Sequence, residues 1–368
     1  MKKILVFGIT DNPGGVESVI MAYYRHIDRN KYQFDFLCNT QKVAHEEEIT
    51  QLGGTIYRVC ARSKNRSQYK KDMKEFFENH SKEYIAIWVN VCSLANIDYL
   101  KYAKKYGIKH RIIHSHNSQN MDTTLRGILH KINKNRIENY ATDFWACSKD
   151  AAEWFYKKNL ANKAIIIHNA IDVSKMQFDL TKRNKIRNDY SLHTFEVIGN
   201  VGRLHFQKNQ EFIIDIFNEL QKENKNYKLV LVGQGEDENK LKQKVSELKL
   251  EESVIFTGVQ SDIQAWLSAF DFFLFPSRFE GLSIAGLEAQ ANGLPVLCSS
   301  KVNPIELKVN DNFQFCSLEN PIDNWKKGIV EGLKVGRMSQ EDIMKNFISC
   351  GYDIHEESKR FERIMENL

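Results

Sequence analysis

The sequence predicts an α/β protein of two domains, each built around a mostly parallel sheet. Short β-rich segments alternate with helical patterns from the start of the chain, and this order indicates parallel strands joined by crossover helices. The chain has 368 residues, which is more than one hydrophobic core usually supports, so two domains of roughly 170 residues each are expected.

The elements follow one another in two series. In the first series the apolar runs predict a helix at 16–27 and strands at residues 4–7, 34–37, 55–59, 85–91, 111–114, 144–147 and 164–168. In the second series they predict a helix at 209–223 and strands at residues 197–201, 228–232, 254–256, 272–275 and 296–298.

A polar, lysine-rich stretch between the two series is typical of an interdomain linker. The predicted domains are therefore 1–172 and 194–351, with the linker at 173–193. The remaining segment, 352–368, predicts one amphipathic helix with Phe361, Ile364 and Met365 on one face.

The composition is that of an ordinary globular protein, with 42 % apolar and 27 % charged residues. The net charge of +5, from 52 basic and 47 acidic residues, is too small to indicate a nucleic-acid partner. Seven cysteines without a C-x-x-C spacing argue against both a disulfide framework and a zinc site. We therefore expect reduced, mostly structural cysteines.

The first apolar run is short. Thr10 and Asp11 interrupt it too early for the hydrophobic region of a signal peptide, which indicates a buried first strand instead. No run approaches the 18 apolar residues of a spanning helix. The expected location is the cytoplasm, with the inner face of the cell membrane as a candidate peripheral site.

Two glutamates follow the predicted strand at 272–275. Ser283 is a good N-cap for a helix after the turn at Glu280 and Gly281, so backbone N–H groups and a positive helix end lie where anions bind to parallel sheets. Glu288 lies in this helix among apolar neighbours, where a charge needs a partner. Both carboxylates could hold hydroxyl groups of one ligand. A capping charge beside a solvated helix residue is the alternative explanation.

Two cations follow the strand at 197–201. The guanidinium of Arg203 can donate two parallel hydrogen bonds to phosphate oxygens, and Lys208 carries a single positive charge. Together these two residues can neutralise a diphosphate. A strand-end arginine with a surface lysine is the alternative. Their position after a strand of a parallel sheet favours the binding site.

Two further segments in the first half end predicted strands. Gly14 and Gly15 allow a phosphate to approach the backbone closely, although a tight turn explains them equally well. His114 and His116 point to one side of their strand, and no carboxylate or cysteine at ligand spacing accompanies them, so no metal is expected. His116, at the strand tip, is the candidate site residue, with a structural histidine as the alternative.

Basic residues cluster twice in the first half. One group comprises Arg62, Lys64, Arg66, Lys70, Lys71 and Lys74. The other shares a predicted helix with apolar residues and comprises Arg126, Lys131, Lys134 and Arg136, beside Leu125, Ile128, Leu129 and Ile132. A basic amphipathic helix can rest on anionic lipid, and a solvated helix face that packs on the sheet is the alternative.

Taken together, these residues resemble the retaining glycosyltransferases of family 4. Their signature is a glutamate, seven residues and a second glutamate, which matches Glu280 and Glu288 within the segments Pro276–Gly281 and Glu288–Pro295. The resemblance covers nearly the whole chain. It implies the GT-B fold, with two facing Rossmann-like domains and a last helix that crosses back to the first domain.

The resemblance also implies roles for individual residues. Glu288 would hold the ribose and Glu280 the transferred sugar, and Arg203 and Lys208 would bind the diphosphate. His116 would lie beside the reacting sugar. The remaining donor contacts would come from Gly14, Gly15, Gly233, Gly258, Val259, Leu282, Ser283 and Ile284. Ser283 departs from the glycine or proline of many members, which leaves its contacts open.

The expected function is retaining, metal-independent transfer of a sugar from a nucleotide sugar. UDP is the commonest carrier in such enzymes, and the implied acceptor is a glycan or a polyprenyl-diphosphate lipid in bacterial surface polysaccharide synthesis. An anionic membrane surface is a further candidate partner, and no cofactor besides the donor substrate is expected. A nucleotide-sugar epimerase and a non-catalytic nucleotide-sugar-binding protein are the alternatives.

Overall fold

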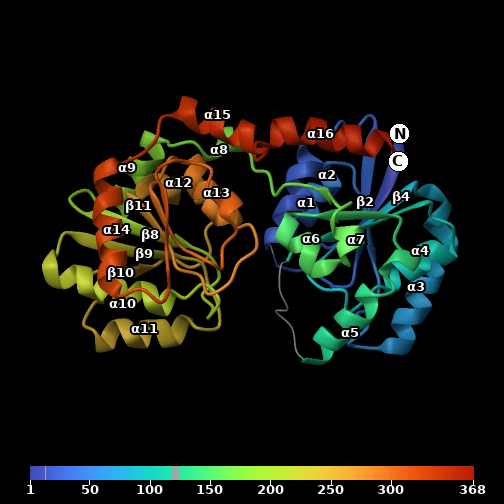
Figure 1. Ribbon diagram of the computed structural model, residues 1–368, viewed down its shortest axis with the longest axis horizontal. Coiled ribbons are helices and arrows are strands. Elements are labelled where there is room, and N and C mark those ends of the chain that lie inside the picture. Colours follow the sequence, from blue (N-terminus) through green and yellow to red (C-terminus); the bar gives the residue numbers. More distant parts are fainter. Residues whose placement is uncertain (13, 118–123) are drawn as a thin grey trace. The chain divides into compact units, whose positions relative to one another are not determined.

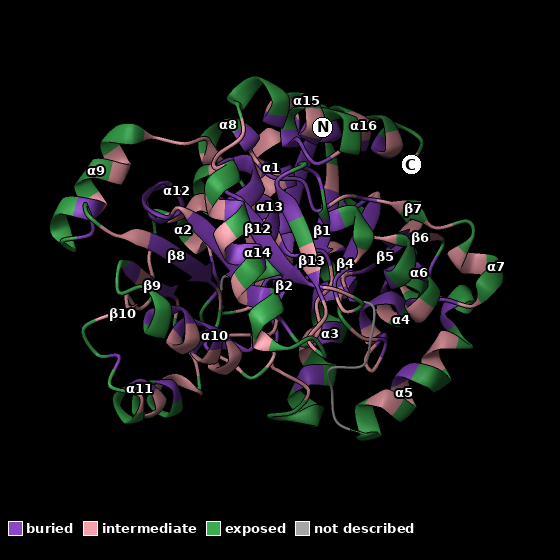
Figure 2. Cartoon of the chain, turned by 60° about the vertical axis from the view of Figure 1, so that its left-hand side comes forward, coloured by how far each residue is buried: buried purple, intermediate pink, exposed green. Residues whose placement is uncertain are grey.

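A computed structural model describes residues 1–12, 14–117 and 124–368 of the chain. The chain forms two compact units: Met1–Ala170 with Ile354–Leu368, and Ile171–Asp353. Each contains a parallel sheet with helices packed against it (Figure 1). The sheet strands are mostly buried, as the purple ribbons of Figure 2 show. The predicted α/β class with parallel sheets is confirmed.

The sheet of the first unit has the order β3-β2-β1-β4-β5-β6-β7 among the described residues. Its strand pairs are parallel, which is why apolar residues occupy both faces of strands such as β1. The strands are β1 (Lys2–Phe7), β2 (Tyr32–Cys38), β3 (Ile56–Arg58), β4 (Ala86–Val91), β5 (His110–Ser115), β6 (Asp143–Ala146) and β7 (Ile165–Ile166).

Helices connect these strands. They are α1 (Gly15–His26), α2 (Glu46–Gln51), α3 (Arg66–His80), α4 (Asp98–Lys105), α5 (Thr124–Lys134), α6 (Lys149–Phe155), α7 (Lys158–Ala161) and, from the end of the chain, α16 (Ile354–Glu366). Short 3-10 turns lie at Ser81–Glu83 and Ile137–Asn139.

The sheet of the second unit has the order β10-β9-β8-β11-β12-β13 among the described residues, again with parallel pairs. Its strands are β8 (Glu196–Val201), β9 (Tyr227–Val232), β10 (Val254–Phe256), β11 (Phe272–Phe275), β12 (Val296–Ser299) and β13 (Phe313–Cys316). Its helices are α8 (Val173–Met176), α9 (Leu180–Asp189), α10 (Gln210–Glu223), α11 (Glu238–Glu247), α12 (Ile263–Ala269), α13 (Ile284–Ala291), α14 (Ile322–Val335) and α15 (Gln340–Cys350), with a 3-10 turn at Ile305–Leu307.

The segment expected to be a linker, residues 173–193, instead carries α8 and α9 and belongs to the second unit. Arg187 explains the difference, because its buried guanidinium donates to the carbonyl oxygens of Ala269 and Leu192 and pairs with Asp271. This packing could not be predicted from the sequence, because the buried residue is an arginine, which is usually exposed, rather than an apolar residue. The chain changes units next to Ile171, whose N–H donates to the carbonyl of Tyr352 at 3.0 Å.

The last helix, α16, completes the core of the first unit. Phe361 is buried, and its ring lies 4.6 Å from Tyr23, 5.3 Å from Trp88 and 5.7 Å from Trp145. The apolar face predicted from Phe361 and its neighbours therefore packs against α1 and the sheet of this unit. Among the described residues, no helix combines the length and hydropathy needed to cross a membrane.

Both sheets reverse their strand order at one point. In the first unit β1 lies between β2 and β4, and in the second β8 lies between β9 and β11. Ligands of open parallel sheets bind outside the carboxyl ends of the strands at such a switch point. The residues after β1, β8 and β11 are therefore in the expected position for a binding site.

Candidate functional site

In the second unit, the loops after β8 and β11 are joined by their backbones. The Asn209 side chain donates to the carbonyl of Pro276 at 3.0 Å, and the N–H of Arg278 donates to the carbonyl of Gln207 at 2.8 Å. The Gln207 amide also donates to the carbonyl of Phe279 at 3.1 Å. These bonds bring the predicted cation segment and the predicted glutamate segment together at the switch point.

Lys208 and Glu280 form an ion pair between these two loops. Lys208 Nζ donates to Glu280 Oε1, and the two side chains are only 17 % and 9 % exposed. Ser277 Oγ donates to the same carboxylate oxygen at 3.3 Å. The lysine stem lies against Gly202, where an added Cβ would come within 3.3 Å of its Cε atom. The glycine thus leaves room for a buried cation at the sheet edge.

Glu288 lies half-buried in α13. Among the described residues its carboxylate has no hydrogen bond or ion pair, and burial raises its pKa to about 7. Burial of a carboxylate without a donor costs free energy, so the group is suited to accept hydrogen bonds from a ligand.

The start of α13 is capped by a side chain. Ser283 Oγ accepts a hydrogen bond from the N–H of Gly286 at 3.3 Å, as the sequence predicts for an N-cap. Leu282 and Ser283 are buried, and Ile284 is half-buried. These three residues follow the turn at Glu280, so they share the segment that carries the ion pair.

Arg203 pairs with a residue of a neighbouring loop in the free protein. Its guanidinium forms an ion pair with Glu236 in the loop after β9, and both side chains are exposed. A backbone N–H and then this guanidinium hold the pKa of Glu236 below its usual range. Within the described structure no contact joins Arg203 to Lys208. Arg203 can bind a ligand beside Lys208 either in place of Glu236 or through the terminal nitrogen that does not contact Glu236.

Glycines allow the loops after β8 and β9 to touch. Gly233 has φ +132°, and a Cβ there would lie 2.1 Å from the carbonyl oxygen of Gly202. Its N–H donates to the carbonyl of Gly258 at 2.9 Å, which extends the contact to the loop after β10. Val259, the next residue, is 63 % exposed. The predicted positions 233, 258 and 259 thus lie along neighbouring strand ends.

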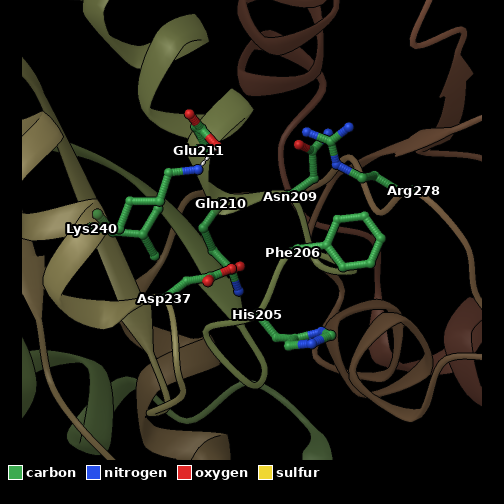
Figure 3. A pocket seen from close by; sticks show the side chains of 9 residues that line it. His205, Phe206, Asn209, Gln210, Glu211, Asp237, Lys240 and Arg278 are labelled. Carbon is green, nitrogen blue, oxygen red and sulfur yellow. Dashed lines mark hydrogen bonds and ion pairs between the residues drawn. The ribbon is translucent and has the colours of Figure 1, made fainter.

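A pocket of about 220 Å³ opens beside the cation segment and was not predicted (Figure 3). Its wall includes Phe206 and Arg278, whose guanidinium carbon lies 5.7 Å from the ring centre. Lys240 and Glu211 form an ion pair at 2.6 Å on another wall. No sequence motif indicates this pocket, because its residues come from separate segments: His205, Phe206, Asn209, Gln210, Glu211, Asp237, Lys240, Leu241 and Arg278.

In the first unit, Gly14 and Gly15 lie exposed at the start of α1. Buried Glu17 shapes the approach to them, since its carboxylate accepts from the N–H and the hydroxyl of Thr10 at 3.1 and 2.6 Å. A Cβ at Gly14 would lie 2.9 Å from the Glu17 carboxylate, whereas nothing lies within 4 Å of one at Gly15. The backbone at Gly15 is therefore open to a ligand.

His116 follows β5 and is held by Asn90 of β4. Its Nε2 lies 2.9 Å from Asn90 Oδ1, and the Asn90 amide nitrogen faces the carbonyls of Phe7 and Trp88. The amide oxygen can only accept, so His116 carries its proton on Nε2 and leaves Nδ1 as an acceptor. Burial lowers its pKa to about 3. His116 is therefore a neutral imidazole at physiological pH.

His114 is fully buried in the same cluster. Its Nδ1 lies 3.3 Å from the Trp88 indole nitrogen and its ring stacks on that indole at 5.9 Å. Burial, and then neighbouring His116, lower its pKa well below the usual value. His114 thus supports the site from beneath. Asn90, which orients both histidines, was not predicted because a lone asparagine in a strand has no motif.

The comparisons with known proteins agree with this geometry. The whole chain superposes on the crystal structure of Anabaena HepE in complex with UDP-glucose, with a TM-score of 0.81, 17 % identity and 100 % coverage of both chains. That likeness establishes the GT-B fold, the class of two Rossmann-like units that the sheets and the returning helix define.

Sequence matches show which proteins the chain is similar to. Residues 182–346 match the family described as Glycosyl transferases group 1. The "Putative glycosyltransferase EpsF" of Bacillus subtilis (strain 168) is 27 % identical over 356 residues, which cover 93 % of this chain and 90 % of that protein. The "UDP-Gal:alpha-D-GlcNAc-diphosphoundecaprenol alpha-1,3-galactosyltransferase" of Escherichia coli is 31 % identical over 179 residues, 46 % of this chain and 44 % of that protein. The chain is therefore similar to the group 1 glycosyltransferases over residues 182–346, and to the Bacillus subtilis protein over most of its length.

Proposed function

We propose that this glycosyltransferase moves a sugar, with retention of anomeric configuration, from a UDP-sugar to a glycan or polyprenyl-diphosphate acceptor in bacterial surface polysaccharide synthesis. The observation that carries the proposal is Glu288, a half-buried carboxylate without a donor in the helix that follows the Lys208–Glu280 ion pair. A ribose diol offers the two hydroxyl donors that such a carboxylate lacks.

The charges of the second unit suit a diphosphate leaving group. Lys208 is held at the switch point and can neutralise charge that develops on the departing nucleotide. When a phosphate oxygen replaces Glu280 on this lysine, the freed Glu280 carboxylate can accept from hydroxyls of the transferred sugar. Arg203 joins either in place of Glu236 or through the terminal nitrogen that does not contact Glu236. With these cations in place, we propose that transfer needs no metal ion.

The donor and acceptor classes rest on similarity to proteins whose names state them. HepE was crystallised with UDP-glucose, and the Escherichia coli relative carries UDP-galactose and a diphosphoundecaprenol acceptor in its name. By the same reasoning the enzyme would work at the inner face of the cell membrane, where a polyprenyl acceptor is held. The neutral His116 and the open backbone at Gly15 are proposed to serve the reaction from the first unit.

The donor is tested by thermal shift with a panel of nucleotide sugars, because a ligand that binds only the folded state raises Tm. We expect UDP-sugars to raise Tm in the wild-type protein and to have no effect on Glu288→Gln. A matched control is Glu306→Gln, an exposed carboxylate of the same unit. A shift of equal size in Glu288→Gln would remove Glu288 from the site.

The reaction itself is tested with the donor that binds. Nuclear magnetic resonance of the product gives its anomeric configuration, and the same assay with a chelator tests metal independence. Incubation with donor alone separates the alternatives, since an epimerase converts the sugar without an acceptor. An inverted product would overturn the retaining mechanism, and a loss of activity that added metal restores would overturn metal independence.

A further inference from the structure

Helix α5 of the first unit carries its apolar residues on the outside. Leu125 is 67 % exposed, Ile128 50 % and Ile132 43 %. Figure 2 shows this helix as mostly exposed or intermediate along its length. An ordinary surface helix turns its apolar stripe to the core, so the arrangement here is reversed.

The opposite side of α5 is fixed to the unit by polar contacts. The N–H of Leu94 donates to His130 Nδ1 at 3.1 Å, and the Asn133 amide donates to the carbonyl of Leu94 at 2.6 Å. Lys134 Nζ donates to the carbonyls of Glu153 and Trp154 at 3.0 and 2.6 Å. These bonds set the rotation of the helix, so its apolar stripe faces outward as a built feature of the fold.

Cations border the apolar stripe on both sides. Each residue of an α-helix is rotated by about 100° about the helix axis from the one before it. Viewed down that axis, Leu125, Ile128, Leu129 and Ile132 therefore lie within an arc of about 100° of the helix circumference. Arg126 and Lys131, both exposed, lie about 60° beyond its two ends by the same geometry. The helix contains no acidic residue. An apolar face framed by cations matches the interface of an anionic bilayer, where acyl chains lie beneath negative headgroups.

The charges disfavour a second copy of this chain as the occupant. Two α5 helices packed through their stripes would bring Lys131 of both copies together, and α5 itself contains no carboxylate. A lipid surface supplies negative charge on all sides of the stripe. We propose that α5 is the membrane-contacting element of this enzyme, inserting Leu125, Ile128 and Ile132 among anionic lipids. The proposed function enters this inference at one point: contact with the membrane would give the enzyme access to its lipid-linked acceptor.

Vesicle sedimentation tests the surface directly. The wild-type chain is expected to sediment with phosphatidylcholine vesicles that contain 30 % phosphatidylglycerol, an amount we choose as roughly that of an anionic leaflet, and to stay in solution with pure phosphatidylcholine. The triple change Leu125→Ser, Ile128→Ser and Ile132→Ser should lower the partition constant about tenfold or more. The double change Arg126→Gln and Lys131→Gln should lower it about fivefold for each cation.

Matched controls come from the second unit. Leu180→Ser with Val335→Ser removes apolar side chains of similar exposure, and Lys185→Gln with Lys327→Gln removes two exposed cations. Both controls should sediment like the wild type. Equal losses in the control and α5 variants would overturn the proposal. An altered elution volume of the serine triple variant, without vesicle binding by the wild type, would assign the stripe to a second copy instead.

The result is independent of the donor site. All variants should keep the wild-type thermal shift with the nucleotide that binds, which also shows that they are folded. Loss of vesicle binding with an intact nucleotide shift supports the membrane role even if the proposed transfer reaction is wrong. Vesicle binding that survives the triple serine change overturns the membrane role of α5 even if transfer is found.

Discussion

At the scale of the residue, the site depends on two carboxylates with opposite surroundings. Glu280 already has a cation and a hydroxyl donor, whereas Glu288 has neither among the described residues. Burial without a partner disfavours the charged form, and this explains why the pKa of Glu288 is raised to about 7. The folded protein thus carries a cost at Glu288 that a bound ligand can remove.

Glu288→Gln should stabilise the free protein while it removes donor binding. The folded chain keeps the Glu288 proton up to about pH 7, while the unfolded chain loses it near the ordinary value of 4.5. The folded state therefore binds more protons in this window, and wild-type stability falls as pH rises through it. Glu288→Gln has no carboxyl group to titrate at this position, so its free energy of unfolding should not fall in this way. The free energy of unfolding of the variant should exceed that of the wild type by almost nothing at pH 4.5 and by at most about 3 kcal/mol above pH 7.

Thermal and denaturant unfolding of both proteins at pH 4.5, 6 and 8 measures this difference, since other titrating groups cancel between them. A pH-independent difference would contradict the raised pKa of Glu288. The same samples report donor binding, so a gain in stability and a loss of function can be read together.

The Lys208–Glu280 pair gives a second prediction at this scale. Lys208→Met leaves the Glu280 carboxylate buried beside Ser277 without its cation, which should cost about 3 kcal/mol. Adding Glu280→Gln removes the orphan charge and should recover most of that stability, yet donor binding should stay absent. A double-mutant cycle by urea unfolding measures the coupling. Additive effects of the two changes would show that the pair contributes no interaction energy.

At the scale of the element, the loops after β8 and β9 are close because Gly233 lacks a side chain. Its added Cβ would overlap the carbonyl oxygen of Gly202, the residue before Arg203. Gly233→Ala should therefore destabilise the protein by about 3 kcal/mol and weaken donor binding. Gly258→Ala is the matched control, since its φ of +66° is also positive but nothing lies within 4 Å. That change should cost only about 1 kcal/mol.

Calorimetry of the two glycine variants, with and without nucleotide, separates these outcomes. Equal destabilisation in both would show that backbone conformation, and not contact between the loops, governs the site.

The elements also show how far sequence reasoning reaches. The strands other than β13 and the N-cap at Ser283 follow from local pattern and were predicted close to their observed positions, whereas β13 was missed. The pairing of Arg203 with Glu236 could not be predicted, because it depends on how two loops meet through Gly233. The helices α8 and α9 were missed since their anchor, Arg187, appears as a surface residue in the sequence.

The direction in which the apolar stripe of α5 faces could not be predicted from the sequence either. Periodicity reveals that Leu125, Ile128 and Ile132 share a face, but not whether that face meets the sheet or the solvent. Only contacts such as that of His130 with Leu94 fix the rotation of the helix.

At the scale of the whole molecule, the two units differ in how the chain builds them. The second unit is one continuous segment, Ile171–Asp353, whereas the first needs the returning helix α16. Phe361 fills a position between Tyr23, Trp88 and Trp145 that residues 1–170 cannot fill themselves. The fold of the first unit is therefore complete only when residues 354–368 are present.

This difference predicts how fragments behave. Residues 171–353 should fold cooperatively alone and keep the donor thermal shift, while 1–170 should be unfolded or molten, since loss of Phe361 alone should cost about 3–5 kcal/mol. Joining 1–170 to 354–368 by a short flexible linker should restore a cooperative transition. In the full chain the hydrogen bond from Ile171 to Tyr352 places the two ends to be joined close together. The joined fragment with the change Phe361→Ala should again lack a cooperative transition. Near-ultraviolet circular dichroism and thermal melts report the outcome. A cooperative melt of 1–170 without α16 would show that these residues form a complete core and that α16 is not needed for folding.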